Sequence, residues 1–195
     1  NGFEVALNYK NQVGDFQYSF GGNMSVNTNK IIDLGESDNM IYDGGDKIDY
    51  IYKVGQSIGS YYGYITDGLY SQAEIDKGEY YKFGRVPNAG DIKYVPQREN
   101  VAWKSDITGE DRAIIGTDVA KYTYGFNINL KYRNFDLSAF GQGISGASVA
   151  FENDALVPFF QGGSARAFHL NRWTTVNPDP EAIYPRIYGG GTLDN

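Results

Sequence analysis

The fold is decided by the stretch YTYGFNINLKY, residues 122–132, in which apolar and polar side chains alternate without a break. The even-numbered residues are all apolar or aromatic, whereas the odd-numbered ones are Thr, Gly, Asn or Lys. A helical period would scatter the apolar side chains around an axis. The period of two therefore predicts a β-strand with one apolar and one polar face.

The same pattern recurs on both sides of short polar segments, which predicts two antiparallel hairpins. Arg133-Asn134 is a two-residue turn, after which the alternation resumes and continues to Gly143. The N-terminal part repeats this arrangement around a polar turn at Lys10 to Asp15. We therefore expect one hairpin over residues 2–27 and a second over residues 119–143.

The remaining chain, residues 28–118 and 144–195, shows no sustained periodicity. Within it we expect short strand-like pieces, such as Ile48 to Val54, and one helical turn near Ser71 to Lys77. Unstructured connections of this length are uncommon in compact domains. Outer-membrane barrels accommodate them, because their strands join through short turns on the periplasmic side and long extracellular loops on the other.

Strand length separates a barrel from a sandwich. A strand that crosses a bilayer needs about 9–11 residues, whereas strands of globular sheets average about 5–6. We therefore predict an all-β fold that is part of a large antiparallel transmembrane β-barrel in the bacterial outer membrane. Because the smallest such barrels have about eight strands, two hairpins would be a piece of a longer chain. The alternative is a soluble cell-surface β-sandwich that binds glycans without transport, since its strands alternate in the same way.

Composition excludes several functional classes. The chain has 17 basic and 24 acidic residues, a net charge of −7, which argues against binding nucleic acid. It has no cysteine and a single histidine, His169, so disulfide frameworks and the usual zinc sites are excluded. Gly163-Ser164 lies near His169, but the chain has no Gly-x-Ser-x-Gly motif. No acidic residue stands at a position that would indicate a Ser-His-acid triad. We expect no catalytic residues, no cofactor and no enzymatic activity, and the less favoured alternative is a secreted glycoside hydrolase.

Several motifs resemble one family in the same order along the chain. They are the stretches VGQSIGSYYGYITDGLY at 54–70, DRAIIG at 111–116, KYTYGF at 121–126, RWT at 172–174 and YPR at 184–186. Together they resemble SusC/RagA-type TonB-linked outer-membrane proteins of the Bacteroidetes, in a late, C-terminal portion of the barrel.

The resemblance implies a transporter barrel of about 22 strands. It further implies import of oligosaccharides or oligopeptides, with a SusD-like surface lipoprotein as the lid over the extracellular loops. Energy would come from TonB, ExbB and ExbD through an N-terminal part of the protein. We expect the plug domain and the TonB box to lie outside these 195 residues.

Loop aromatics are the candidate substrate contacts, because flat rings stack on sugars while nearby carboxylates bind hydroxyl groups. The predicted substrate-binding residues are Tyr61, Tyr62, Tyr64, Asp67 and Trp103. The alternative for the tyrosines is that they pack the long loop together. Trp103 is a better candidate than the tyrosines, because an exposed indole in a polar loop is costly without a partner.

Two further predictions concern the lid and a metal. Trp173 and Asn177 are expected to contact the lid. Many relatives carry an acidic calcium-type loop before the Asp-Arg-x-x-Ile-Gly element, and here Asp106, Glu110 and Asp111 offer oxygen atoms at that place. The regular spacing of a calcium loop is lost, however. We therefore expect a solvated acidic turn and no bound metal.

Overall fold

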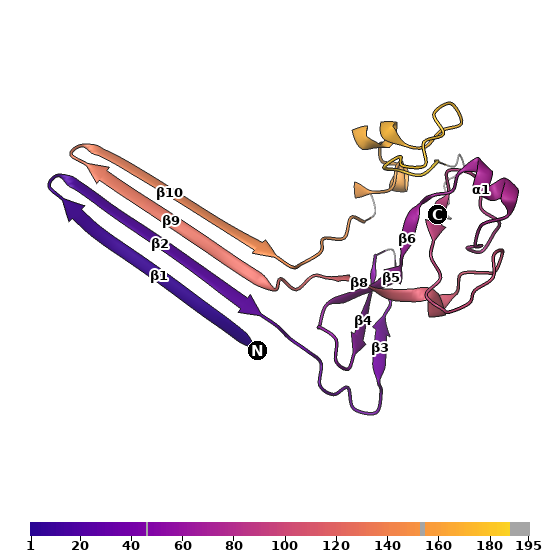
Figure 1. The fold of residues 1–195 in the computed structure, drawn as a ribbon, viewed down its shortest axis with the longest axis horizontal. Coiled ribbons are helices and arrows are strands. Elements are labelled where there is room, and N and C mark those ends of the chain that lie inside the picture. Colours follow the sequence, from indigo (N-terminus) through magenta and orange to yellow (C-terminus); the bar gives the residue numbers. More distant parts are fainter. Residues whose placement is uncertain (46, 153–154, 188–195) are drawn as a thin grey trace. The chain divides into compact units, whose positions relative to one another are not determined.

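The computed structural model of the protein describes residues 1–45, 47–152 and 155–187. The chain divides into two compact units (Figure 1). The first comprises residues 1–42, 51–60 and 116–149, and the second comprises the described parts of 43–50, 61–115 and 150–195. The end of the predicted second loop, residues 188–195, lies outside the described residues.

The first unit is built on a four-stranded antiparallel sheet in the order β1-β2-β9-β10 (Figure 1). Its strands are β1 (Gly2–Val13), β2 (Phe16–Asn27), β9 (Tyr122–Tyr132) and β10 (Phe135–Ser145). The predicted alternation and both hairpins are present, each strand being 11 or 12 residues long. Strands β2 and β9 pair directly, from Phe16 opposite Tyr132 to Val26 opposite Tyr122. The long segment between them therefore leaves and re-enters the sheet at neighbouring strands.

Both hairpin turns lie at the same end of this sheet and are tight. Strand β1 continues to Val13, so its turn is Gly14-Asp15 and not the whole predicted stretch from Lys10. Gly14 and Arg133 both have left-handed backbones, with φ of 60° and 52°. Arg133 Nε donates a hydrogen bond to Asp15 Oδ2 at 3.3 Å, which links the two turns by an exposed pair of small energetic value.

The pairing register gathers the apolar side chains on one face of the sheet. Leu7, Gly22, Phe126 and Gly141 form one row across the four strands. A β-carbon on Gly141 would lie 2.6 Å from a ring carbon of Phe126, so the ring covers this glycine. Leu7 is 74% exposed, so the apolar face is not part of a protein core.

The opposite face is polar and carries hydrogen bonds between strands. Asn129 Nδ2 donates to Ser19 Oγ at 3.2 Å, and Ser138 Oγ donates to Asn129 Oδ1 at 2.9 Å. These bonds join side chains of β2, β9 and β10 directly opposite one another. Phe140 and Ile144 interrupt this face, and both are exposed.

Residues 28–118 contain more regular structure than their sequence suggests. A second four-stranded sheet has the order β3-β4-β5-β8, and β6 pairs with β7 in an antiparallel manner. The strands are β3 (Asn39–Tyr42), β4 (Asp49–Lys53), β5 (Ser60–Tyr64), β6 (Thr66–Leu69), β7 (Ile92–Tyr94) and β8 (Arg112–Thr117). The strand predicted near Ile48 is confirmed as β4, whereas the others were missed because each is too short to show a period.

The predicted helical turn is α1 (Gln72–Lys77), and its ends are set by local chemistry. Ser71 Oγ accepts a hydrogen bond from the Glu74 amide, and the Glu74 carboxylate accepts one from the Ser71 amide at 2.9 Å. This capping box satisfies amides that a helix start leaves without partners. Gly78 ends the helix with φ of 76°, a left-handed conformation that suits glycine. Among the described residues no helix is long and apolar enough to cross a membrane.

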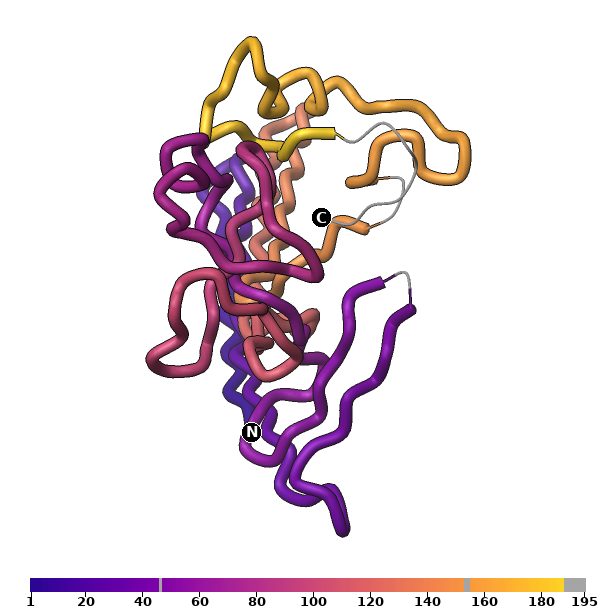
Figure 2. The backbone as a smooth tube through the Cα atoms, turned by 90° about the vertical axis from the view of Figure 1, so that its right-hand side faces the viewer, coloured from indigo at the N-terminus to yellow at the C-terminus, as the bar shows by residue number. Residues whose placement is uncertain are grey.

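The core of the second unit joins distant parts of the chain. Leu69, Ala89 and Trp173 are buried together, with Ile92 and Ala182 packed against them. Figure 2 shows the yellow C-terminal segment running beside the magenta segment, where the Arg186 amide donates to the Gly90 carbonyl at 3.0 Å. Short 3-10 turns in the described part of this unit include η1 (Gly109–Asp111), η3 (Phe160–Gly162) and η4 (Ala167–Asn171).

Candidate functional site

The second unit contains a cavity of about 580 Å³ whose lining includes aromatic and charged side chains. Its volume lies within the range of about 300–1,000 Å³ that is typical of small-molecule sites. Its lining includes Trp103 and Tyr81, here called the aromatic wall, and Asp67, Glu74 and Lys93, here called the charged wall. The structure thus brings two of the predicted substrate-binding residues, Asp67 and Trp103, to the same cavity.

The aromatic wall is a stacked pair of rings. The ring centroids of Trp103 and Tyr81 lie 4.7 Å apart, with 30° between the ring planes. Trp103 remains 53% exposed in this arrangement. Tyr81 therefore covers one face of the indole, and the stacking interaction helps to hold the half-exposed Trp103 ring at the cavity lining.

Backbone hydrogen bonds hold the segment that carries Trp103. The Lys104 amide donates to the Tyr80 carbonyl at 2.7 Å, and the Lys82 amide donates to the Ser105 carbonyl at 2.9 Å. The Ile107 amide then donates to the Lys82 carbonyl at 2.8 Å. Lys104 has φ of 69°, so the chain turns sharply directly after the indole. The exposed ring therefore stands on a backbone with a defined position.

The charged wall centres on Lys93. Its Nζ lies 3.0 Å from Glu74 Oε1 and 3.4 Å from Asp67 Oδ2. Partial burial opposes ionisation of Glu74, but hydrogen bonds from Ser71 and Lys93 outweigh it and lower the pKa of Glu74 to about 2. Burial likewise opposes the charge on Lys93, yet its two carboxylate partners raise the pKa of its ammonium. Glu74 and Lys93 are therefore both charged at neutral pH.

A second ion pair lies beside the cavity and is more deeply buried. Asp111 is fully buried, and its two oxygens accept from Arg98 Nε at 2.9 Å and Arg98 Nη2 at 2.8 Å. The same carboxylate also accepts from the amides of Gln97 at 3.1 Å and Thr108 at 2.8 Å. The Arg98 guanidinium is the main reason that the pKa of Asp111 is held well below its usual range. Such a carboxylate organises the loop around it.

The predicted solvated acidic turn is therefore wrong for Asp111. Asp106 is exposed and pairs with Lys82 Nζ at 3.1 Å, and Glu110 is exposed. The oxygens of Asp111 are already occupied by arginine and amide donors. Within the described ranges no group of three or more carboxylates or histidines is placed to hold a metal ion.

The three predicted tyrosines lie outside the cavity lining. Tyr61 is buried, with its ring 5.2 Å from that of Tyr50. Tyr62 lies under the guanidinium of Arg112, 4.4 Å from ring centroid to Cζ, and Tyr64 packs edge-on against Phe83 at 5.0 Å. This placement favours their role in packing the loop. A substrate contact for them stays a prediction.

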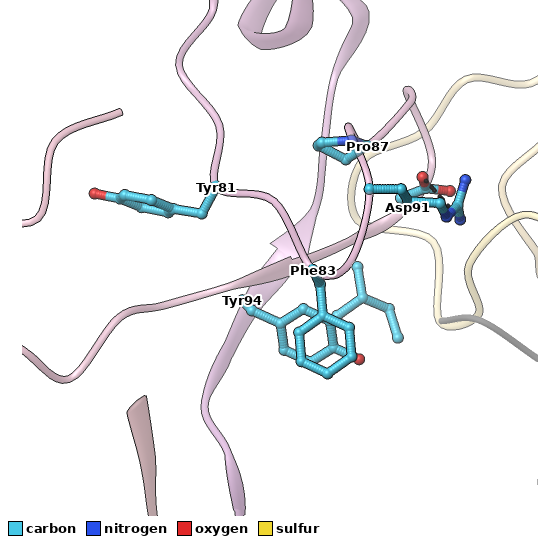
Figure 3. A pocket seen from close by; sticks show the side chains of 7 residues that line it. Tyr81, Phe83, Pro87, Asp91 and Tyr94 are labelled. Atoms are coloured by element: carbon cyan, nitrogen blue, oxygen red, sulfur yellow. Dashed lines mark ion pairs between the residues drawn. The ribbon is translucent and has the colours of Figure 1, made fainter. Parts of the chain in front are cut away.

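A second, smaller pocket is lined by residues that include Tyr81, Phe83 and Tyr94. Its volume of about 20 Å³ is enough for about one water molecule. The rings of Phe83 and Tyr94 lie over one another on its floor, 4.6 Å between centroids (Figure 3). Tyr81 points away from them (Figure 3). The direction of Tyr81 suits its other contact, the stack with Trp103.

The predicted lid contacts have contrasting environments. Trp173 is buried in the core of the second unit and does not present its ring at the surface. Asn177 is exposed in a turn, where its amide donates to Thr174 Oγ1 at 3.0 Å. Contact with a lid stays a prediction for both residues, and only Asn177 is placed at the surface.

His169 is buried with both ring nitrogens bonded to backbone. Its Nδ1 accepts from the Arg166 amide at 2.8 Å, and its Nε2 lies 2.8 Å from the Leu156 carbonyl. These bonds assign the neutral tautomer with the proton on Nε2. The imidazole therefore acts as a structural tie between loop segments.

The sequence is similar to those of two TonB-dependent receptors. TonB-dependent receptor P3 of Formosa agariphila is 28% identical over 193 residues, which is 95% of this chain and 19% of that receptor. TonB-dependent receptor P26 of the same organism is 29% identical over 198 residues, or 96% of this chain and 19% of that receptor. The chain resembles TonB-dependent receptors along nearly its whole length. This finding confirms the predicted relationship to TonB-linked outer-membrane proteins.

The similarity covers only part of each receptor, and it extends to a solved structure. The chain spans about a fifth of the length of the curated receptors that it matches. A solved structure described as the RagAB peptide transporter matches all of this chain and 20% of its own, with a TM-score of 0.70 and 18% identity. That match confirms the predicted all-β antiparallel fold of this transporter type, of which this chain forms an open portion. No family model matches the chain.

Sequence reasoning missed several cavity residues of this receptor-like chain. Tyr81, Lys93 and Arg98 come from segments with no recognisable pattern. Glu74 had a usable signal, because Ser71 followed three residues later by Glu predicts a capping box that fixes the glutamate at a helix start. The cavity itself depends on pairing between distant segments, which a local pattern does not contain.

Proposed function

We propose that the chain forms part of the barrel of a TonB-dependent importer in a bacterial outer membrane. The observation that carries this proposal is the similarity to TonB-dependent receptors over 95% of the chain. The four long antiparallel strands and the fold likeness to a transporter support it further. We propose no enzymatic activity for this part of the protein.

In this proposal the apolar face of the sheet contacts lipid and the polar face looks into the barrel. Strands of 11 or 12 residues are long enough for a tilted crossing of the bilayer, which needs about 9–11. Leu7 and Phe135 lie on the apolar face and are 74% and 79% exposed. A soluble sandwich would bury this face against a second sheet, so the exposed side chains favour the barrel over that alternative.

The two tight turns would face the periplasm, and the long segments would lie on the extracellular side. The cargo in this proposal is an oligosaccharide or an oligopeptide, captured under a SusD-like surface lipoprotein. Energy for import would come from TonB, ExbB and ExbD. The likeness to the RagAB structure supports transport of this general kind, because RagAB is described as a peptide transporter. The peptide cargo is stated of RagAB itself.

A pair of neighbouring substitutions in β1 tests the membrane placement. Leu7→Arg would place a charge on the lipid face and cost about 2–4 kcal/mol near the middle of the bilayer. Ala6→Arg, one residue away, would place the same charge on the polar face. In the full-length protein we expect Leu7→Arg to reduce the heat-modifiable folded form in outer membranes, with Ala6→Arg close to the unchanged protein. Equal effects, or extraction of the parent protein without detergent, would refute the proposal.

A further inference from the structure

We propose that the cavity beside Trp103 binds an organic cation, an alkylammonium or guanidinium group carried on an apolar stem. Such a site goes beyond the proposed import function and does not depend on it, because the side chains that form it all belong to the second unit. Three features of the cavity carry the inference: the half-exposed indole of Trp103, the carboxylate of Glu79 and the paired state of the basic side chains in the lining.

The indole of Trp103 is placed to contact a cation. Tyr81 stacks on it with 4.7 Å between ring centroids, and Trp103 still keeps 53% of its surface exposed. A cation within about 6 Å of a ring centroid is attracted by the negative charge of the ring face, and tryptophan attracts it most strongly. The methylene groups of an apolar stem gain further contact by covering the ring. The backbone bonds of Lys104 and Lys82 hold the indole in this position without a ligand.

Glu79 supplies a carboxylate whose bonding capacity is unused. It lines the cavity and is partly buried. In the part of the chain that the structure describes, its side chain makes neither a hydrogen bond nor an ion pair. The ammonium of Lys104 lies beside Gly78 and does not line the cavity. Because a partly buried carboxylate has lost part of its hydration, a ligand that donates to Glu79 is favoured.

The basic side chains of the lining are already paired. Lys93 lies between Glu74 and Asp67, and Arg98 makes two bonds to the buried Asp111. The three carboxylates of the lining therefore share a single ammonium. A sugar hydroxyl or a neutral amide would donate to the same oxygens, but only a cation also offsets the excess negative charge and is attracted to the ring face. This combination favours a cation over either neutral donor.

Ligands matched in shape but not in charge test the inference on the detergent-purified full-length protein. We expect butylguanidine to bind about tenfold more tightly than its neutral isostere butylurea, and the difference to shrink as salt is added. A neutral glucose hexasaccharide should not displace butylguanidine. A hexapeptide with blocked ends and one arginine is compared with its citrulline counterpart to find the source of the cation. Binding of the arginine peptide assigns a polypeptide side chain, whereas binding of butylguanidine alone assigns a small free cation.

Two substitutions and two matched controls assign the binding to this cavity. Glu79→Gln keeps the shape of the side chain and should weaken butylguanidine about tenfold. Trp103→Ala removes the ring and should weaken it about fivefold. Glu110→Gln and Phe151→Ala alter exposed side chains outside the lining and should bind as the unchanged protein does.

Equal binding of butylurea, displacement by the hexasaccharide, or unchanged affinity in either cavity variant overturns the inference. Each variant is first checked for the heat-modifiable folded form, so that lost binding is not mistaken for lost assembly. None of these results bears on the proposed import function, which the paired substitutions in β1 test separately.

Discussion

The indole ring of Trp173 lies directly over the α-carbon of Gly90. A β-carbon at position 90 would come within 2.4 Å of two ring carbons, which is closer than side chains approach one another. Gly90 also has φ of 86°, a conformation that other residues adopt only with strain. Its carbonyl accepts from the Arg186 amide, so the backbone and the indole together join the two halves of this core.

Gly90→Ala is expected to loosen the second unit by about 2–4 kcal/mol, because strain and overlap with a buried ring add together. Gly84→Ala is the matched control. Gly84 has φ of 70° in the same segment, but its β-carbon would meet no atom within 4 Å. Limited proteolysis of the full-length protein should cleave the Gly90 variant much faster than the Gly84 variant. Equal rates would mean that Trp173 yields easily to the added methyl group.

Gly141→Ala should weaken the four-stranded sheet by about 1 kcal/mol, since the Phe126 ring must leave its place over the glycine. Gly22 lies on the other side of Phe126 in the same row. A β-carbon there would make only an ordinary contact at 3.7 Å, so Gly22→Ala is the control. The temperature at which the folded form disappears on gels should fall for the Gly141 variant alone. A similar fall for both would argue against the ring packing.

Asp111→Asn is expected to destabilise the loop around residues 97–111 by about 2–3 kcal/mol. The substitution leaves the Arg98 guanidinium without its charged partner and weakens bonds to the Gln97 and Thr108 amides. Glu110→Gln removes a neighbouring exposed carboxylate and should have little effect. Hydrogen exchange of these amides distinguishes the two variants. Unchanged protection in Asp111→Asn would contradict the structural role.

Acid should loosen the second unit over a defined pH range. The folded-state pKa of Glu74 is about 2, and the pKa of Asp111 is held well below its usual range, whereas unfolded carboxyl groups titrate near pH 4. Carboxyl groups with lowered pKa stabilise the fold fully above about pH 4 and lose this contribution as the pH falls through the folded pKa. We expect constant hydrogen exchange protection, corrected for intrinsic rates, from pH 8 to 5 and a fall toward pH 2. Glu74→Gln should remove part of that fall, and loosening confined to pH 5–8 would contradict the assignment.

The four-stranded sheet was predictable because the alternation of apolar and polar residues lies within each single strand. Residues 122–132 alternate so regularly that the apolar and polar faces follow from the sequence alone. The helix α1 was predictable for a similar reason, since Ser71 and Glu74 are three residues apart and cap the same turn. The short strands β3 and β7 were missed, because three or four residues do not reveal a period.

The candidate site was predictable only in part. Trp103 was recognisable as an exposed aromatic in a polar loop, and the cavity beside it includes Asp67 as well. Tyr61 and Trp173 also lie in distinctive sequence motifs, yet both side chains are buried. Composition does not tell an exposed aromatic from a buried one, because the same ring serves either environment.

The sequence by itself determined the two hairpins, the faces of their strands and the resemblance to TonB-linked receptors, all of which depend on residues close along the chain. The tertiary structure alone decided that Tyr81 stacks on Trp103 and that Lys93 lies between two carboxylates. It also decided that the buried Asp111 pairs with Arg98. Each of these contacts joins segments more than ten residues apart. Their geometry follows from how the segments pack, which no local period encodes.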